Sequence, residues 1–205
     1  MSEDANSLAA SLEGTDLSNL YSVIDRHNVH GLNLVVPEAA KAVIKPWADR
    51  ADEEKHADSN VDDQLIIHVP FMERVRIRSI LLKLGRGEST PKHLRIYANH
   101  SNIIDFADAE QTKPQLNITL LEGQTGVVEY PLRSAAFASI HSLSLFFNEA
   151  VGDEQSRIYY IGFRGDMRST KQSQTSELEV PAPHTSDASL VDKAANRAAQ
   201  QPTAR

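Results

Sequence analysis

The sequence predicts an all-β protein, a β-sandwich or jelly roll, on three observations. The run at 74–84 opens with apolar and basic residues in alternation, Val75-Arg76-Ile77-Arg78. This period of two is typical of a strand with one buried and one exposed face. Similar short runs recur as far as Phe163, separated by turn signals rich in Gly, Asn and Pro. No amphipathic helix separates the runs, which argues against βαβ units and favours two packed antiparallel sheets.

The individual elements follow from local composition. Strands are expected at 64–69, 74–84, 93–98, 115–120, 126–130, 140–147 and 157–163. The first is a short β-branched run that Pro70 is expected to end. Upstream, 17–24 reads as a short helix or turn that Asp16 can cap. In the extended segment 27–47, Pro37 and Pro46 exclude a long helix but leave room for one turn at 38–41. Residues 49–63 are expected to form a charged loop.

The chain is predicted to hold one folded domain between two tails. Residues 17–165 carry the strand pattern and enough apolar content for a single core. Residues 1–16 are rich in Ser, Ala, Glu and Asp, and we expect a flexible lead. Residues 166–205 are rich in Ser, Thr, Gln, Pro and Ala and nearly free of aromatic residues. Such a composition buries too little apolar surface to offset the entropy of ordering, so this tail is predicted to be disordered.

Charge and cysteine content narrow the function classes. The formal net charge of −7 argues against a nucleic-acid binder and against docking on anionic membranes. The absence of cysteine excludes disulfides, thiolate nucleophiles and cysteine-based metal centres. The acidic residues after Met1 contain no apolar signal region, and no apolar run reaches membrane-spanning length. We therefore expect a cytoplasmic and nuclear protein.

Two groups of side chains have the composition of metal sites but not the pattern. His27 and His30 are three residues apart, yet the Asn and Gly around them disfavour a regular helix. His56 lies among carboxylates in the 49–63 loop, without the spacing of an EF-hand. Solvated side chains are the better interpretation for both groups, and we expect no metal and no cofactor. His68 alternates with apolar neighbours and is expected to point outward from its strand.

The candidate residues for catalysis and for phosphate binding also lack the pattern that such sites need. Ser139 and His141 share one side of a strand, but no orienting acid or oxyanion site accompanies them. The turn Gly85-Arg86-Gly87 lacks the lysine and helix start of a phosphate-binding loop. No catalytic residue is predicted, and the chain is not expected to be an enzyme.

One group of residues suggests protein docking. Arg74, Arg76 and Arg78 share a strand face, which is either a solvated outer face or a docking surface for an acidic protein patch. Trp47, in Ile44-Lys45-Pro46-Trp47, joins them if it is exposed; otherwise it plugs one end of the sandwich. The alternative to a docking module is a small-ligand binder of carbohydrate type, with Trp47, Tyr97 or Tyr130 as the stacking platform.

Five collinear segments resemble the PITH domain family. They are Leu20-Tyr21-Ser22-Val23-Ile24-Asp25, Val43-Ile44-Lys45-Pro46-Trp47, Asp63-Gln64-Leu65-Ile66-Ile67-His68-Val69-Pro70-Phe71, Arg78-Ser79-Ile80-Leu81-Leu82 and Arg157-Ile158-Tyr159-Tyr160-Ile161-Gly162-Phe163-Arg164-Gly165. The resemblance spans roughly 17–165. It implies a galactose-binding-domain-like jelly roll, brings no catalytic residues, and suggests the regulatory particle of the 26S proteasome as protein partner. The thioredoxin domain found in some relatives is missing from this sequence, so dithiol redox chemistry is not carried over.

Overall fold

The computed structural model describes residues 18–100, 102–132, 135–152 and 154–167. The predicted N-terminal lead at 1–16, which includes the expected helix cap Asp16, lies outside the described residues, as do residues 168–205 of the predicted C-terminal tail. Its strands are β1 (His30–Leu32), β2 (Ala57–Asp58), β3 (Leu65–Leu84), β4 (Pro91–Ala98), β5 (Leu116–Thr119), β6 (Val128–Pro131), β7 (Ile140–Ala150) and β8 (Arg157–Met167). All named pairs are antiparallel, in a path β2-β8-β3-β7-β4-β5, with β1 and β6 also paired to β3. The predicted β-sandwich is confirmed.

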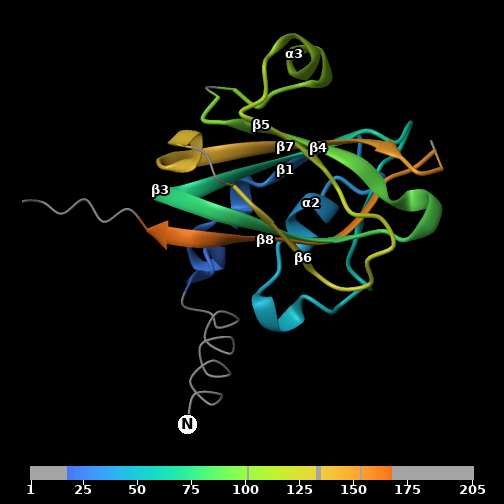
Figure 1. Cartoon of the computed structure of the whole chain (residues 1–205), viewed down its shortest axis with the longest axis horizontal. Coiled ribbons are helices and arrows are strands. Elements are labelled where there is room, and N and C mark those ends of the chain that lie inside the picture. Colours follow the sequence, from blue (N-terminus) through green and yellow to red (C-terminus); the bar gives the residue numbers. More distant parts are fainter. Residues whose placement is uncertain (1–17, 101, 133–134, 153, 168–205) are drawn as a thin grey trace, which may run out of the picture. The chain divides into compact units, whose positions relative to one another are not determined.

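The long strand β3 belongs to both layers of the sandwich. Its first part, 65–70, pairs with β7 and β1, whereas 75–84 pairs mainly with β8 and β6. Figure 1 shows β3 turning at one edge of the molecule, so that its two parts run in different layers. The first sheet therefore contains β1, β7, β4 and β5, and the second contains β8, β2 and β6.

The prediction that Pro70 ends its strand was wrong. The ladder of β3 with β7 shifts register between Pro70 and Val75, so the proline sits at a bulge inside one bent strand. Proline lacks the N–H that a regular ladder needs, but a bulge tolerates that loss. Its carbonyl still accepts a hydrogen bond from the backbone N–H of Asp25 at 2.9 Å. Two predicted strands are thus a single one.

The other expectations hold with small shifts. The remaining strands are present within a few residues of their predicted bounds, and α2 (Ala39–Ala42) is the single turn expected between the two prolines. The helix expected at 17–24 is a short 3-10 turn, η2 (Tyr21–Val23), which begins after Leu20. The short strands β1 and β2 and helix α3 (Phe106–Gln111) were not predicted. No helix in the described residues is long and apolar enough to cross a membrane.

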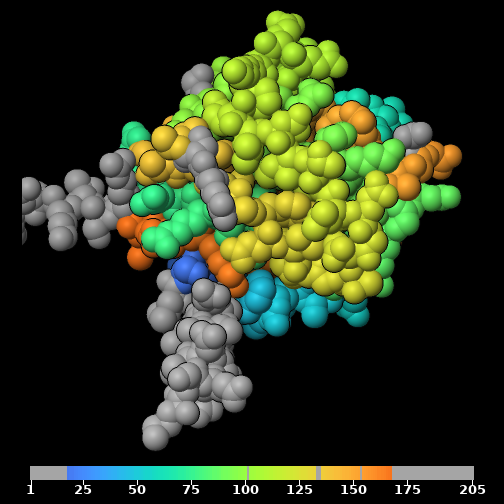
Figure 2. Space-filling model, in the orientation of Figure 1, coloured from blue at the N-terminus to red at the C-terminus, as the bar shows by residue number. Residues whose placement is uncertain are grey.

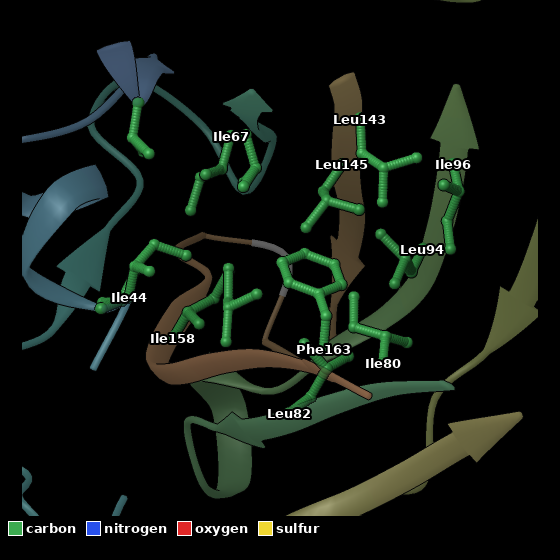
Figure 3. Packing of buried hydrophobic residues seen from close by; sticks show 14 of the residues in the cluster. Ile44, Ile67, Ile80, Leu82, Leu94, Ile96, Leu143, Leu145, Ile158 and Phe163 are labelled. Atoms are coloured by element: carbon green, nitrogen blue, oxygen red, sulfur yellow. The ribbon is translucent and has the colours of Figure 1, made fainter. Parts of the chain in front are cut away.

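The main core lies between the two sheets. Inward side chains from both parts of β3 meet those of β4, β7 and β8, and Figure 3 shows Ile67, Ile80, Leu94, Leu145 and Phe163 converging. All five side chains are fully buried. Burial of each contributes about 1.5–3 kcal/mol.

A smaller apolar cluster lies on the outside of the first sheet. Ile66, Tyr97 and Phe146 point outward from β3, β4 and β7 and are covered by the segment that contains α3. Phe106 of α3 packs edge-on against Phe146 with ring centroids 5.7 Å apart. The Tyr97 hydroxyl donates a hydrogen bond to the Ala109 carbonyl at 2.6 Å. This outer face is therefore closed by the chain itself.

Candidate functional site

The predicted arginine row lies on the outer face of the second sheet. Arg74, Arg76 and Arg78 are exposed, while Val75 and Ile77 between them are 0% and 2% exposed. The period-two prediction is confirmed, because alternate side chains of this part of β3 enter the core. Figure 2 shows this stretch (green) at the surface, between the segment that opens β7 (gold) and the end of β8 (orange).

The three arginines have different partners. Arg78 forms an ion pair with Asp166 at 2.8 Å. Arg74 donates only to a neutral group, the hydroxyl of Ser139, at 3.4 Å. Arg76 lines an open cavity of about 290 Å³ together with Ala138, Asp166 and Met167. Among the described residues, neither Arg74 nor Arg76 has a carboxylate partner. The row thus offers two guanidinium groups that are free to bind an anion.

The backbone beneath the row is held tightly against β8. Gly165 pairs with Ile77, and a Cβ atom placed on Gly165 would lie 1.9 Å from the carbonyl oxygen of Arg76. Only glycine permits this approach, because any side chain would push the two strands apart. The arginines therefore project from a rigid base, which lowers the entropic cost of binding.

Trp47 lies on the same outer face and is half-buried. It opens the short 3-10 helix η4 (Trp47–Asp49), which lies on the outer side of the second sheet, below β8 and β6 in the view of Figure 1. Its ring meets Tyr160 edge-on at 6.3 Å, and the guanidinium groups of Arg50 and Arg164 lie 4.1 Å and 5.5 Å from its centroid. Trp47 therefore packs over Tyr160 while part of its ring stays accessible. This lies between the two alternatives of an exposed ring and a ring that closes one end of the sandwich.

Arg164 connects Trp47 to the arginine row. Its Cα partner in the ladder is Ser79, the residue after Arg78. The guanidinium also forms an ion pair with Glu129 of β6 at 2.7 Å, and Glu129 accepts a hydrogen bond from the Ser79 hydroxyl. All four predicted docking residues therefore belong to one continuous outer face.

Two buried lysines that the sequence did not single out fix the loop beside Trp47. Lys45, 5% exposed, donates to the carbonyl groups of Asp52 and Lys55 at 2.7 and 2.8 Å. Lys83, 6% exposed, donates to the Ala51 carbonyl and pairs with Glu53 at 2.8 Å. The hydrogen bond from Lys83 holds the pKa of Glu53 below its usual range. The predicted charged loop is thus anchored, and long-range pairing of this kind leaves no local pattern in a sequence.

The outer face of the first sheet carries a different set of polar groups. His68 points outward as predicted, and its Nδ1 lies 3.0 Å from the hydroxyl of Ser144. Burial, with smaller contributions from the charges of His30 and His141, lowers the pKa of His68 to about 4. His68 is therefore neutral at physiological pH.

The remaining polar candidates are not brought together. His27 lies in η3 (Arg26–Asn28), ahead of His30 in β1, and both are exposed. His56 lies 3.6 Å from Asp58, but Arg157 already holds that carboxylate with two bonds of 2.6 and 2.7 Å. In the part of the chain that the structure describes, no three His, Asp or Glu side chains are grouped to hold a metal ion.

Two of the three aromatic side chains expected as platforms for a sugar, Tyr97 and Tyr130, are buried. Tyr97 and Tyr130 are 1% and 7% exposed. The Tyr97 hydroxyl donates to the Ala109 carbonyl, and the Tyr130 hydroxyl accepts a hydrogen bond from the Leu121 N–H at 2.9 Å. Burial raises the pKa of both phenols. Neither ring can stack on a sugar without opening the fold.

A family model for the PITH domain matches residues 10–182. The chain belongs to the PITH domain family. It is 33% identical over 165 residues to PITH domain-containing protein CG6153 of Drosophila melanogaster, which covers 80% of this chain and 77% of that protein. It is 30% identical over 172 residues to PITH domain-containing protein P35G2.02 of Schizosaccharomyces pombe, with 82% of each chain covered. PITH domain-containing protein 1 of Homo sapiens is 29% identical over 147 residues, 72% of this chain and 69% of that protein.

Solved structures with the same fold include sugar-binding proteins. A family 32 module, CpGH89CBM32-5 from Clostridium perfringens in complex with GalNAc-β-1,3-galactose, has a TM-score of 0.51 and 11% identity, over 72% of this chain and all of that one. The fucolectin of striped bass serum has a TM-score of 0.50 and 10% identity, over 73% of this chain and 49% of that one. At such low identity the likeness shows the galactose-binding-like sandwich fold alone. The resemblance to the PITH family and its fold are thus both confirmed.

Proposed function

We propose that this PITH protein is a non-enzymatic interaction module that binds the regulatory particle of the 26S proteasome. The proposed contact surface is the arginine face, defined as Arg74, Arg76, Arg78 and Trp47 on the outer side of the second sheet. The observation that carries the proposal is the exposed arginine row on a rigid strand, with two members lacking a carboxylate partner among the described residues. Arginine is enriched at protein interfaces because its planar group stacks and pairs in fixed geometry.

Charge supports a protein partner over a nucleic acid. The chain as a whole carries −7, so a long phosphate backbone would be repelled by most of the surface. A local row of arginines on an acidic protein instead suits an acidic patch of limited size. The choice of the proteasome as the partner rests on what the resemblance to the PITH family implies. A cytoplasmic and nuclear location would place the chain in the same compartments as that partner.

A binding experiment with purified 26S proteasome tests the proposal. The chain is mixed with proteasome at physiological salt and sedimented, and the bound fraction is compared with that of the Arg74→Glu/Arg76→Glu variant. Arg78 is left intact because its pair with Asp166 ties β3 to β8. Loss of two charge-assisted contacts is expected to weaken binding at least about tenfold.

A matched control separates the site from net charge. Lys55→Glu/Lys113→Glu makes the same change in charge at two exposed lysines outside the arginine face. This control is expected to bind within about twofold of the original chain. No sedimentation of the original chain, or equal binding by the arginine variant, would refute the proposal.

A further inference from the structure

A second cavity lies beside Trp47 and is separate from the one beside Arg76. It measures about 290 Å³, and its walls come from two segments far apart in the sequence, 47–51 and 125–127. Lys83 of β3 lines it as well. Figure 2 shows the two segments, in cyan and yellow, side by side at the lower surface of the molecule. We call this hollow the Trp47 cavity.

Arg50 brings a positive charge without a counter-ion to the Trp47 cavity. Its guanidinium lies 4.1 Å from the centroid of the Trp47 ring and donates to the Trp47 carbonyl at 2.8 Å. Among the described residues it has no carboxylate partner. The acidic residues of the same segment, Asp49 and Asp52, line a different cavity with Lys45. A guanidinium held in place by stacking is well suited to bind a carboxylate.

Lys83 adds a second positive charge from inside the fold. Its ammonium group donates to the Ala51 carbonyl at 3.0 Å and pairs with Glu53 at 2.8 Å, which uses two of its three N–H groups. Arg86 pairs with the same Glu53 carboxylate at 2.6 Å, so one negative charge serves two cations. Together with Arg50, this part of the surface is positive on a chain whose net charge is −7.

The other walls of the Trp47 cavity are uncharged. Trp47 and Val127 supply apolar surface, and Thr125 supplies a hydroxyl. None of the described residues that line this cavity is acidic, whereas Asp166 lines the cavity beside Arg76. Small-molecule sites begin at about 300 Å³, so a small ligand suits this hollow and a large cofactor does not. The second charge of a phosphate would find only apolar walls, which favours a carboxylate.

We infer that the Trp47 cavity binds a small carboxylate with an adjoining apolar group, a chemistry that free organic acids and the C-terminal residues of protein chains share. The carboxylate lies on Arg50 and Lys83, and the apolar group lies between Trp47 and Val127. The inference goes beyond the proposed function, because neither Arg50 nor Lys83 belongs to the arginine face.

The fluorescence of Trp47 tests the inference without a label, because Trp47 is the only tryptophan of the chain. The full chain is titrated with N-acetyl-leucine, which carries a carboxylate and an apolar side chain but no ammonium group. A saturable change in emission is expected. N-acetyl-leucinamide, which has the same apolar group and no charge, is expected to bind at least about tenfold more weakly.

A short peptide that ends in leucine separates the two sources of the ligand. Tighter binding of this peptide than of N-acetyl-leucine would assign the Trp47 cavity to chain ends, and equal binding would assign it to free acids. In both cases the C-terminal amide of the same peptide is expected to bind at least about tenfold more weakly than its acid.

Two variants locate the site. Arg50→Gln is expected to weaken binding of N-acetyl-leucine at least about tenfold. Arg26→Gln is the matched control, because Arg26 stacks on Tyr21 at 4.8 Å and donates to its hydroxyl outside the cavity. Gly126→Glu adds a negative charge to the wall, where nothing lies within 4 Å of an added Cβ atom. It is expected to weaken binding while urea unfolding stays unchanged.

Several results would overturn the inference. They are the lack of a saturable change in Trp47 emission, equal binding of acid and amide, and equal binding by the Arg50→Gln and Arg26→Gln variants. Tighter binding of inorganic phosphate or of galactose than of N-acetyl-leucine would also overturn it. None of these results bears on the dependence of proteasome binding on Arg74 and Arg76, so the inference and the proposed function fail separately.

Discussion

The two outer faces of the sandwich begin on one strand and differ in how they are closed. Outward from the first part of β3, Ile66 is buried beneath the segment that carries α3. Outward from the second part, Arg74, Arg76 and Arg78 remain exposed. Apolar side chains on an outer face force the chain to cover itself, because water-exposed apolar area costs about 25 cal/mol per Å². An arginine row has no such need, so it is available to a partner. The first face serves stability, and the second carries the surface that we propose for recognition.

Removal of Phe146 would break the covered face and gives the largest expected effect. Phe146 is 3% exposed and packs on Phe106 of α3. Phe146→Ala is expected to lower the free energy of unfolding by about 3–4 kcal/mol. Urea denaturation measures the loss, and hydrogen exchange in α3 should rise with it. A loss below that of the milder Phe146→Leu would mean that α3 does not depend on this contact.

A side chain at Gly165 would disturb the exposed face from beneath. Gly165→Ala places a Cβ atom against the carbonyl of Arg76, and the strands must separate to admit it. We expect a loss of about 2–3 kcal/mol in thermal or urea unfolding. Gly126→Ala is the control, because nothing lies within 4 Å of the added Cβ atom there. Equal stability of the two variants would contradict the close approach of β3 and β8.

His68 makes the covered face sensitive to pH. Its folded-state pKa of about 4 lies below the ordinary 6.5, so between these values the unfolded chain binds a proton that the folded chain does not. The contribution of His68 to stability is complete above pH 6.5 and is lost as the pH falls towards 4. From pH 7.5 to pH 5 the expected loss is about 2 kcal/mol.

Urea unfolding at the two pH values measures this loss, and His68→Gln should remove most of the difference. The same pH dependence in His68→Gln as in the original chain would place the titrating group elsewhere.

Removal of the arginine row gives the smallest expected effect on stability. Arg74→Ala/Arg76→Ala is expected to change the free energy of unfolding by less than about 0.5 kcal/mol, because neither side chain has an ion-pair partner among the described residues. Differential scanning calorimetry checks this. A large destabilisation would show that the row supports the fold, and it would remove the contrast between the two faces.

The sequence was sufficient for features that rest on local pattern. The alternation Val75-Arg76-Ile77-Arg78 predicted both the strand and its exposed face, and the two prolines around α2 limited that helix to one turn. The bend in β3 could not be predicted, because proline ends some strands and sits at the bulge of others. Helix α3 was missed although Asp105 caps it by accepting a hydrogen bond from the Asp108 N–H at 2.8 Å.

The extent of the candidate site depended on distant pairings. Trp47 is linked to the arginine row through Arg164, more than a hundred residues later in the chain, and Lys83 secures the loop beside it through Glu53. Contacts between residues so far apart in the sequence leave no periodic pattern from which they could be predicted. The cavity beside Arg76 could not be predicted either, because its lining residues Ala138 and Met167 are far apart in the sequence.

Hydroxyl-radical footprinting of the chain with and without purified 26S proteasome tests the central claim most directly. Met72, two residues before Arg74, and Met167, which lines the cavity beside Arg76, report on the neighbourhood of the arginine face, while Ile103, 39% exposed beside the α3 segment, and Leu121, 54% exposed, report on other surfaces. The account predicts that bound proteasome protects the two methionines from oxidation and leaves the modification of Ile103 and Leu121 unchanged. Protection of Ile103 with both methionines still reactive would contradict it.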